Sequence, residues 1–599
     1  MSDKGVDIAW KDFEVVRPLP SAEIKQREKQ SKSLEPIPVL DKFSGVIKKG
    51  SFTTILGSSG SGKTTFLNFL SNRLHFLDGL QYKGEVFING TNRKVLDYNS
   101  VAGYVMQEEV LLEFLKVRET LEFSASFKMS KKKAEKRASE VISQLGLKSC
   151  EDSIVGGLLQ KGISGGEKKR LAIGVELLID PSILFLDEPT TGLDSYNAEN
   201  LIELLKDLKK QTGVTIIATI HQPNSYMFHN FDRILLLGGS VMIYHGRASK
   251  ALAYFSNLGF ECPEYSNPSE FLLELLSSTS ENYEANIVKL KETALTQEPE
   301  IETSPLPELF KREPVGFFKQ TGLLVYRSSL NITRNVTAIL YKIVANLCFL
   351  LLVMAAYFQA CDENDLTSVT DRAGIIFVIL VYMAFIGVNS TTSLSTDKAL
   401  FIREQASHTY GPAAFYLSKL LFDIPFDEII VAVMAFLLYL VVGLSIESSG
   451  QIFFFVFVIL ILDFTTRGWG NFLLISLPNL EAASAATPFV VIIQLLFAGV
   501  FINYDSIPVY LKWLEYASMF KYAWSACMIN ELDDYDEDHW DGCEEGEEYE
   551  ESDMCDPLDF YSIYIAKWNN VLILLLIAAV THFLSYVVLA VIAQKYRVN

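Results

Sequence analysis

The sequence has few charged residues for its length, and basic residues are the scarcer kind. Only 21% of the 599 residues are Asp, Glu, Lys or Arg, and 52 basic residues stand against 72 acidic ones, which gives a formal net charge of -20. A chain with this excess of negative charge repels phosphate backbones, so a DNA-packaging role is excluded. The mean hydropathy of +0.22 and the 49% of hydrophobic residues exclude an intrinsically disordered chain.

Cysteine is also scarce, and the first residues contain no secretory leader. Seven cysteines in 599 residues exclude a small domain held together by disulfides. Residues 1–20 are polar and have no apolar core of the kind found in signal peptides. We therefore expect the N-terminal half of the chain to stay in the cytosol.

The second half contains long runs without a single Asp, Glu, Lys or Arg. A helix needs about 20 apolar residues to cross the hydrocarbon core of a bilayer, and each run comes close to or exceeds that length. A further run, Ile452–Leu477, is interrupted only by Asp463 and Arg467. The pattern predicts six membrane spans, and buried core helices of a large soluble protein are the weaker alternative. The uncharged runs are Ile343–Cys361, Ala373–Thr396, Ile429–Ile446, Ala482–Tyr504 and Trp568–Gln594.

The charges of the connecting segments predict the topology. Lys398 and Arg403 lie between the second and third runs, where the positive-inside rule places the cytosol. The segment Glu531–Asp559 contains 16 Asp and Glu and no Lys or Arg, so we expect a large acidic exofacial loop there. Cys543 and Cys555 share this loop, and a disulfide between them is our expectation in an oxidising compartment. An intersubunit bridge and free thiols are the alternatives.

A glycine-rich segment follows a short apolar strand in the first half. Residues 52–56 read Phe-Thr-Thr-Ile-Leu, and the next nine residues lead into an apolar helix. This strand–loop–helix context is that of a phosphate-binding loop, in which backbone N–H groups cradle phosphate oxygens. Lys63 would reach the β- and γ-phosphates and the Thr64 hydroxyl would ligate Mg²⁺. The predicted nucleotide-binding residues are Gly57, Ser58, Ser59, Gly60, Ser61, Gly62, Lys63, Thr64 and Thr65.

A second buried strand ends in two carboxylates. Residues 182–186 read Ser-Ile-Leu-Phe-Leu and are followed by Asp187 and Glu188. Open α/β sheets bind ligands at the carboxyl ends of their strands. Asp187 fits the orientation of Mg²⁺ through water, and Glu188 fits a general base or a water-positioning group. A helix N-cap is the structural alternative for this pair.

A second anion-binding turn lies between these motifs. The Ser164-Gly165-Gly166-Glu167 turn opens a basic helix, and helix N-termini attract phosphate. One phosphate-binding loop already holds one nucleotide. The second turn therefore needs either a second nucleotide or a partner chain.

These motifs, in this order, resemble those of ATP-binding-cassette transporters. The resemblance rests on the phosphate-binding loop, Gln107, the Ser164 turn, the Asp187 strand end, a Gly192-Leu-Asp194 loop and His221. With the cassette before the membrane domain, the chain resembles the half-transporters of subfamily G, the white/brown group. The resemblance implies an α/β P-loop ATPase (1–281), a linker (282–315) and an all-α transmembrane domain of six helices (316–599). It also gives catalytic roles to Gln107 and His221, with Gln107 as a further metal ligand.

The resemblance implies an ATP- and Mg²⁺-dependent exporter that works as a dimer. In this family the signature residues Ser164, Gly165, Gly166 and Glu167 act on the nucleotide of the partner chain. We expect a homodimer in a plasma or organelle membrane, in contact with lipids and with no nucleic-acid partner; a heterodimer is the alternative. An ATP-regulated channel or regulatory ATPase on the same scaffold is the second functional reading.

The membrane half resembles the subfamily as well, through Phe401-Ile-Arg-Glu404 and Asp371-Arg372-Ala-Gly. This alignment places Tyr382 and Phe385 in the family's central cavity and Val500 with Phe501 at an apolar exit plug. An aromatic, uncharged cavity suggests a flat lipophilic substrate such as a sterol, lipid or amphipathic drug. Lipid-facing aromatic residues are the alternative.

Two features remain open. Asp463 and Arg467 are spaced i, i+4 and can pair on one helix face, so we favour a structural ion pair over a functional one. An adenine-stacking aromatic residue is not evident, because neither Trp10 nor Phe13 has a compelling spacing from the phosphate-binding loop.

Overall fold

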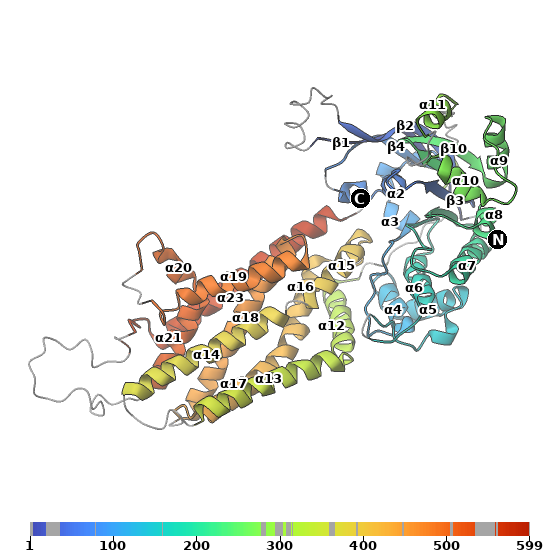
Figure 1. Cartoon of the computed structure of the whole chain (residues 1–599). Coiled ribbons are helices and arrows are strands. Elements are labelled where there is room, and N and C mark those ends of the chain that lie inside the picture. Colours follow the sequence, from blue (N-terminus) through green and yellow to red (C-terminus); the bar gives the residue numbers. More distant parts are fainter. Residues whose placement is uncertain are drawn as a thin grey trace, which may run out of the picture. The chain divides into compact units, whose positions relative to one another are not determined.

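The structure is a computed structural model of the chain, shown in Figure 1. It describes residues 4–19, 36–77, 79–157, 160–276, 283–293, 304–306, 313, 315–358, 366–390, 393–445, 448–502, 507–532, 558 and 561–597. The chain forms two compact units. The first comprises Met1–Leu323, Arg403–Tyr410 and Lys595–Asn599, and the second Leu324–Ile402 and Gly411–Gln594.

Two β-sheets form the frame of the first unit. The larger has the order β10-β9-β3-β8-β7-β6 and is parallel except for the antiparallel pair β9–β10. Its central strands are buried along their whole length because helices cover both faces. The smaller sheet, β2-β1-β4-β5, is antiparallel. The strands are β1 (Ile8–Arg17), β2 (Ile37–Ile47), β3 (Phe52–Gly57), β4 (Gln81–Ile88), β5 (Thr91–Asn92), β6 (Ala102–Val105), β7 (Ile183–Leu186), β8 (Thr215–Thr219), β9 (Arg233–Gly238) and β10 (Val241–Arg247).

Helices α4, α5 and α6 of the first unit form a cluster. These three pack on one another through the apolar core that also lies under the large sheet. The helices are α2 (Lys63–Leu70), α3 (Tyr98–Val101), α4 (Val117–Ser126), α5 (Lys131–Gln144), α6 (Gly165–Leu177), α7 (Ser195–Thr212), α8 (Ser225–Asn230), α9 (Ala248–Asn257), α10 (Pro268–Leu275) and α11 (Tyr283–Thr293), with short turns η1 (Leu74–Phe76), η2 (Arg93–Val95) and η3 (Lys148–Cys150).

Two expectations for the first unit are changed by the structure. Helix α11 lies inside the predicted linker, and its Ile287 and Leu290 are buried in the same core as the large sheet. Two apolar residues one turn apart are enough to dock such a helix, and a search for sustained periodicity misses them. Trp10 and Phe13 are fully buried among Phe43 and the other rings of β1, β2 and α2, so neither offers a face to adenine.

The second unit is helical. Within the described residues five helical segments are long and apolar enough to cross a membrane: α13, the middle of α14, the continuous α16–η4–α17, α18 and α23. The helices are α12 (Phe317–Thr333), α13 (Val336–Tyr357), α14 (Leu366–Ser390), α15 (Ser393–Ala406), α16 (Pro412–Ser418), the π-helical η4 (Lys419–Asp423), α17 (Ile424–Val442), α18 (Ser449–Ser476), α19 (Leu480–Leu496), α20 (Lys512–Ala517), α21 (Met519–Leu532) and α23 (Lys567–Lys595).

The fifth of the six predicted spans is shorter than the sequence suggests. The uncharged run continues to Tyr504, but helix α19 ends at Leu496 and has only 17 residues. At 1.5 Å per residue it covers about 26 Å, slightly less than the hydrocarbon core. The backbone then leaves the helix and reaches Gly499 with a φ of 92°. An uncharged run therefore marks apolar surroundings, but it does not fix where a helix ends.

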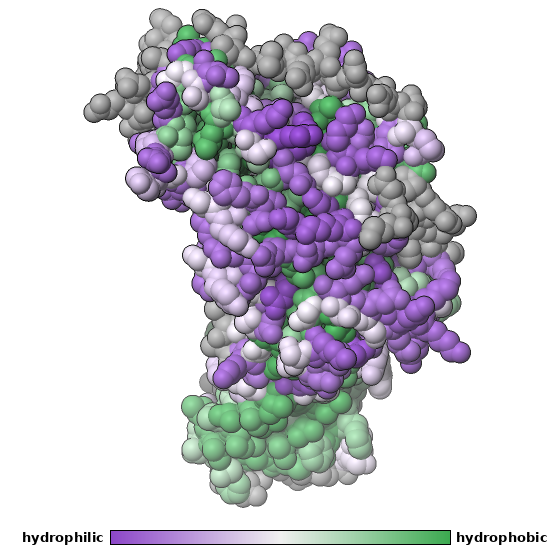
Figure 2. Space-filling model, turned by 90° about the vertical axis from the view of Figure 1, so that its right-hand side faces the viewer, coloured by the Kyte–Doolittle hydropathy of each residue, from purple (hydrophilic) through white to green (hydrophobic). Residues whose placement is uncertain are grey.

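Large apolar side chains are exposed along the membrane helices, as expected for a surface that faces lipid. Leu340, Val344 and Leu351 of α13 are about half exposed, and Phe583 of α23 is 64% exposed. Figure 2 shows such an apolar surface at the bottom of the view.

The predicted acidic loop begins later than expected. Glu531 is the penultimate residue of α21, where its carboxylate is buried and accepts a 2.6 Å hydrogen bond from Arg372 Nη1. It also accepts from the backbone N–H of Ser445. A count of acidic residues does not show that this carboxylate is buried and paired. The predicted disulfide residues Cys543 and Cys555 lie outside the described residues.

Candidate functional site

The phosphate-binding loop connects β3 to α2 and has its expected shape. Gly60 and Gly62 have φ values of 78° and 90°, which favour glycine, and Gly62 immediately precedes α2. A Cβ on Gly57 would lie 2.6 Å from the carbonyl oxygen of Leu237, so only glycine fits there. The Lys63 ammonium group donates to the carbonyl oxygens of Gly57 (2.9 Å) and Ser58 (3.1 Å). The loop thus holds the lysine at the position where a phosphate would compete for it.

Asp187 lies at the end of β7, beside this loop. Strand β8 runs between β3 and β7, and its last residue, Thr219, donates to Asp187 Oδ1 at 2.7 Å. The Thr64 hydroxyl donates to the same oxygen at 3.1 Å, and the Tyr104 hydroxyl lies 3.4 Å from the other. The parallel register therefore brings together the two residues predicted to act on the metal, Thr64 and Asp187.

Glu188 is held at the edge of the same site. Its Oε2 accepts hydrogen bonds from Gln107 Nε2 and from the Thr191 hydroxyl, both at 3.0 Å. Its backbone has a φ of 45°, an unfavourable conformation for a residue with a Cβ, and its N–H donates to Thr219 Oγ1 at 2.8 Å. Strain of this kind is stored where side-chain direction matters. The structure thus joins Gln107 to Glu188, which sequence order alone does not show.

The charged groups of the site suit two ligands, a phosphate beside Lys63 and a cation beside Asp187. Burial lowers the pKa of the Lys63 ammonium group, and the carboxylates of Glu188 and Asp187 oppose this shift. Burial raises the pKa of Asp187, and the hydrogen bonds from Thr219 and Thr64 oppose that shift. A phosphate would favour the charged form of Lys63, and a cation would favour the charged form of Asp187.

The residues present fit a magnesium ion. Mg²⁺ prefers hard oxygen ligands, and the Thr64 hydroxyl and the Asp187 carboxylate supply them 3.1 Å apart. Gln107 donates from its amide nitrogen to the Glu188 carboxylate. Only its amide oxygen would then be available to a metal ion.

The signature turn is built as a preorganised helix start. Ser164 is the N-cap of α6, and its hydroxyl accepts from the Glu167 N–H at 3.3 Å. Glu167 Oε2 in return accepts from the Ser164 N–H and hydroxyl, both at 2.8 Å. This reciprocal capping box fixes the turn and leaves the N–H groups of Gly165 and Gly166 for an external anion. His221 is exposed in the turn after β8, two residues past Thr219.

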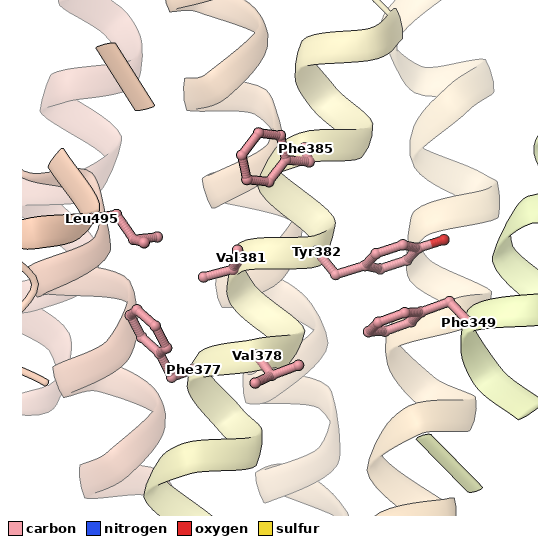
Figure 3. Close-up of a pocket in the computed structure, with 7 residues that line it drawn as sticks. All are labelled: Phe349, Phe377, Val378, Val381, Tyr382, Phe385 and Leu495. Atoms are coloured by element: carbon pink, nitrogen blue, oxygen red, sulfur yellow. The ribbon is translucent and has the colours of Figure 1, made fainter. Parts of the chain in front are cut away.

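The second unit contains an apolar pocket of about 430 Å³ on one face of α14 (Figure 3). Tyr382 and Phe385, the predicted cavity residues, line it. The Tyr382 ring stacks on Phe349 of α13 with centroids 3.4 Å apart and planes 6° apart. Its hydroxyl turns away from the pocket, toward Asn346 Oδ1 at 3.4 Å. The lining residues are Phe349, Phe377, Val378, Val381, Tyr382, Phe385 and Leu495.

The predicted exit-plug residues do not line this pocket. Phe501 is 61% exposed and packs edge-on against Phe377 with centroids 5.2 Å apart, while Val500 packs into the helix core. Sequence analysis missed Phe377 and Val381, although their spacing to Phe385 gives the signal. These three residues recur every four positions and therefore share one helix face.

Comparison with known proteins shows which family the chain resembles. The family model "ABC transporter" matches residues 40–191, and two models named "ABC-2 type transporter" match residues 221–296 and 319–532. The chain is 32% identical over 536 residues to the "Broad substrate specificity ATP-binding cassette transporter ABCG2" of Rattus norvegicus, covering 82% of this chain and 80% of that one. It is 31% identical to the Rattus norvegicus "ATP-binding cassette sub-family G member 5" (82% and 79% covered). It is also 31% identical to "Protein white" of Drosophila melanogaster (83% and 75% covered).

Proposed function

Because the chain belongs to the G subfamily of ATP-binding-cassette transporters, whose cassettes couple ATP hydrolysis to transport, we propose that it is a dimeric exporter of flat lipophilic molecules. Membership makes it a multi-pass membrane ATPase with its cassette in the cytosol. The proposal adds the direction of transport, the dimer and the substrate class.

The pocket on α14 is the observation that carries the substrate class. Its lining is aromatic and aliphatic, and the one hydroxyl among the lining residues, that of Tyr382, is turned toward α13. A pocket without exposed donors or acceptors disfavours substrates that would bury polar groups in it, because each polar group left without a hydrogen bond costs free energy. The flat faces of Tyr382 and Phe385 suit planar rings, which stack with aromatic side chains. Sterols, planar drugs and similar lipids meet both conditions.

The signature turn supports the dimer. All the hydrogen bonds described for the Ser164 side chain go to Glu167, and this capping leaves the N–H groups of Gly165 and Gly166 at the helix start for an external anion. A second copy would supply one, the nucleotide held by its own Lys63. A symmetric dimer has two such sites, each formed by the phosphate-binding loop of one chain and the signature turn of the other.

In the proposed cycle each residue has a limited task. The N–H groups of the phosphate-binding loop and Lys63 hold the β- and γ-phosphates, for which Lys63 gives up its two carbonyl partners. Glu188, oriented by Gln107 and Thr191, positions the attacking water and accepts its proton. Thr64 and Asp187 would hold Mg²⁺, which neutralises phosphate charge when bound.

Replacement of Phe385 by alanine tests the pocket. Loss of one stacked ring costs about 0.5–1.5 kcal/mol of binding free energy. The substrate concentration that gives half-maximal ATPase stimulation should therefore rise roughly two- to twelve-fold. We expect Phe385→Ala to reach its membrane and keep its basal ATPase activity in nanodiscs, but to respond less to sterols and planar drugs. The matched control is Phe583→Ala on α23, because the Phe583 ring is 64% exposed outside the pocket. If both variants respond like the wild type, the pocket does not bind substrate.

A further inference from the structure

Five charged side chains from three helices meet inside the membrane unit. Arg467 of α18 donates from Nε to Asp463 Oδ2 at 2.5 Å and from Nη1 to Asp427 Oδ2 of α17 at 3.0 Å. Lys342 of α13 donates to the other oxygen of Asp427 at 2.7 Å. Glu428, the neighbour of Asp427, lies with Oε1 3.8 Å from Arg467 Nε. The ion pair expected between Asp463 and Arg467 is thus part of a larger cluster.

The charges of this cluster do not balance. Asp427, Glu428 and Asp463 carry three negative charges when ionised, against two positive charges on Lys342 and Arg467. Asp463 is fully buried, Arg467 is 4% exposed and the Glu428 side chain is 17% exposed. An uncompensated charge inside a membrane protein costs several kcal/mol and is normally neutralised.

Carboxylate oxygens without a hydrogen-bond partner show which groups a proton would neutralise. Among the described residues, neither oxygen of Glu428 accepts a hydrogen bond, and Asp463 Oδ1 accepts none either. The Glu428 and Asp463 carboxyl groups converge on Arg467, whose Nε lies 3.8 Å from Glu428 Oε1 and 2.5 Å from Asp463 Oδ2. Two ionised carboxylates cannot bond to each other, because neither has a hydrogen to donate. One added proton would supply a donor between one Glu428 oxygen and Asp463 Oδ1, and it would cancel the excess charge.

The other groups around the cluster do not take this role. Lys342 is engaged by Asp427. The ring of His582 on α23 lies between the Tyr416 hydroxyl, 2.8 Å from Nδ1, and the Phe464 carbonyl oxygen, 3.0 Å from Nε2, so both of its nitrogens are already engaged. Helix α14 presents Gly387, where a Cβ would lie 2.8 Å from Asp463 Oδ1.

We propose that Glu428 and Asp463 form a proton-binding site, and that the protonation state of this site determines the pH dependence of ATP-driven turnover. The proton comes from water, forms an O–H bond on a Glu428 oxygen and is shared with Asp463 Oδ1. No electron transfer or other reactant is involved. Because the site joins α17 to α18, its protonation state changes how strongly these two spans hold together as the transporter cycles.

Infrared spectroscopy tests the bound proton directly, without a transport assay. The wild-type protein in nanodiscs should show a carboxylic-acid C=O band that shifts in D₂O and that is lost in Glu428→Gln. Glutamine imitates the neutral acid, so this variant should fold. The matched control is Glu531→Gln, since the Glu531 carboxylate is buried but already accepts bonds from Arg372 and Ser445. This control should leave the band in place.

The pH profile of ATPase activity gives the functional readout. The wild-type profile should contain a transition that Glu428→Gln removes, and that Asp463→Asn removes or displaces by at least one pH unit. Glu531→Gln should retain the transition. A band that is missing from the wild type or that persists in Glu428→Gln would overturn the proposal, as would identical pH profiles for the wild type and Glu428→Gln.

Discussion

Glu188 shows how a single residue is aimed by contacts that come from distant parts of the chain. Its carboxylate accepts hydrogen bonds from Gln107, which follows β6, and from Thr191, which lies three residues after Glu188 itself. Its backbone N–H is fixed by Thr219 at the end of β8. The unfavourable φ of 45° is maintained by this set of bonds. In the proposed cycle, a residue held in this way positions a water molecule.

Glu188→Gln should therefore abolish ATP turnover and leave ATP binding intact. Glutamine keeps the size of the side chain and an acceptor oxygen for Thr191, but it cannot accept a proton. A general base contributes about 10²–10⁴-fold, so we expect steady-state ATPase activity to fall by at least about a hundredfold. The measurement is ATPase activity beside nucleotide trapping in the purified protein. Activity above a tenth of the wild type would show that another group activates the water.

At the scale of elements, the sequence predicts what is local and misses what depends on packing. The phosphate-binding loop and its helix are encoded within residues 52–70 and were predicted, as was the strand before Asp187. The end of α19 at Leu496, the docking of α11 and the burial of Glu531 were not predicted. Each depends on a neighbour far away in the sequence. The charge cluster was half predicted, because Asp463 and Arg467 share one helix whereas Glu428 comes from another.

Helix α14 approaches α18 closely at one glycine, which gives a prediction for packing. A Cβ at Gly387 would lie 2.8 Å from Asp463 Oδ1 and 3.3 Å from Thr466 Cβ. Such overpacking costs about 1–3 kcal/mol, so Gly387→Ala should lower the thermal unfolding temperature of the detergent-solubilised protein. The matched control is Gly374→Ala on the same helix, where a Cβ meets nothing within 4 Å. Equal unfolding temperatures for the two variants would contradict the close approach.

At the scale of the whole molecule, the chain has the parts of one half of a transporter. It supplies one phosphate-binding loop, one signature turn and one set of membrane spans. The pocket on α14 and the signature turn are each formed by a single chain. In the proposed dimer a second copy provides the same two surfaces in return, and this reciprocity is the basis of closed twofold assemblies.

A dimer with a different lesion in each chain tests this reciprocity. Lys63→Ala removes the ammonium group from the phosphate site, and Gly165→Asp places a negative charge at the signature turn. The substitution at Gly165 is tolerated within its own chain, because a Cβ there lies 3.7 Å from Leu193, an ordinary contact. If the two elements meet across the dimer, the mixed dimer has one site with both lesions and one site with neither. It should trap about half as much nucleotide as the wild type, whereas dimers carrying both lesions in each chain should trap none. Differently tagged copies allow the mixed dimer to be isolated, and nucleotide trapping at the level of the double mutant would show that the signature turn does not act on the partner's nucleotide.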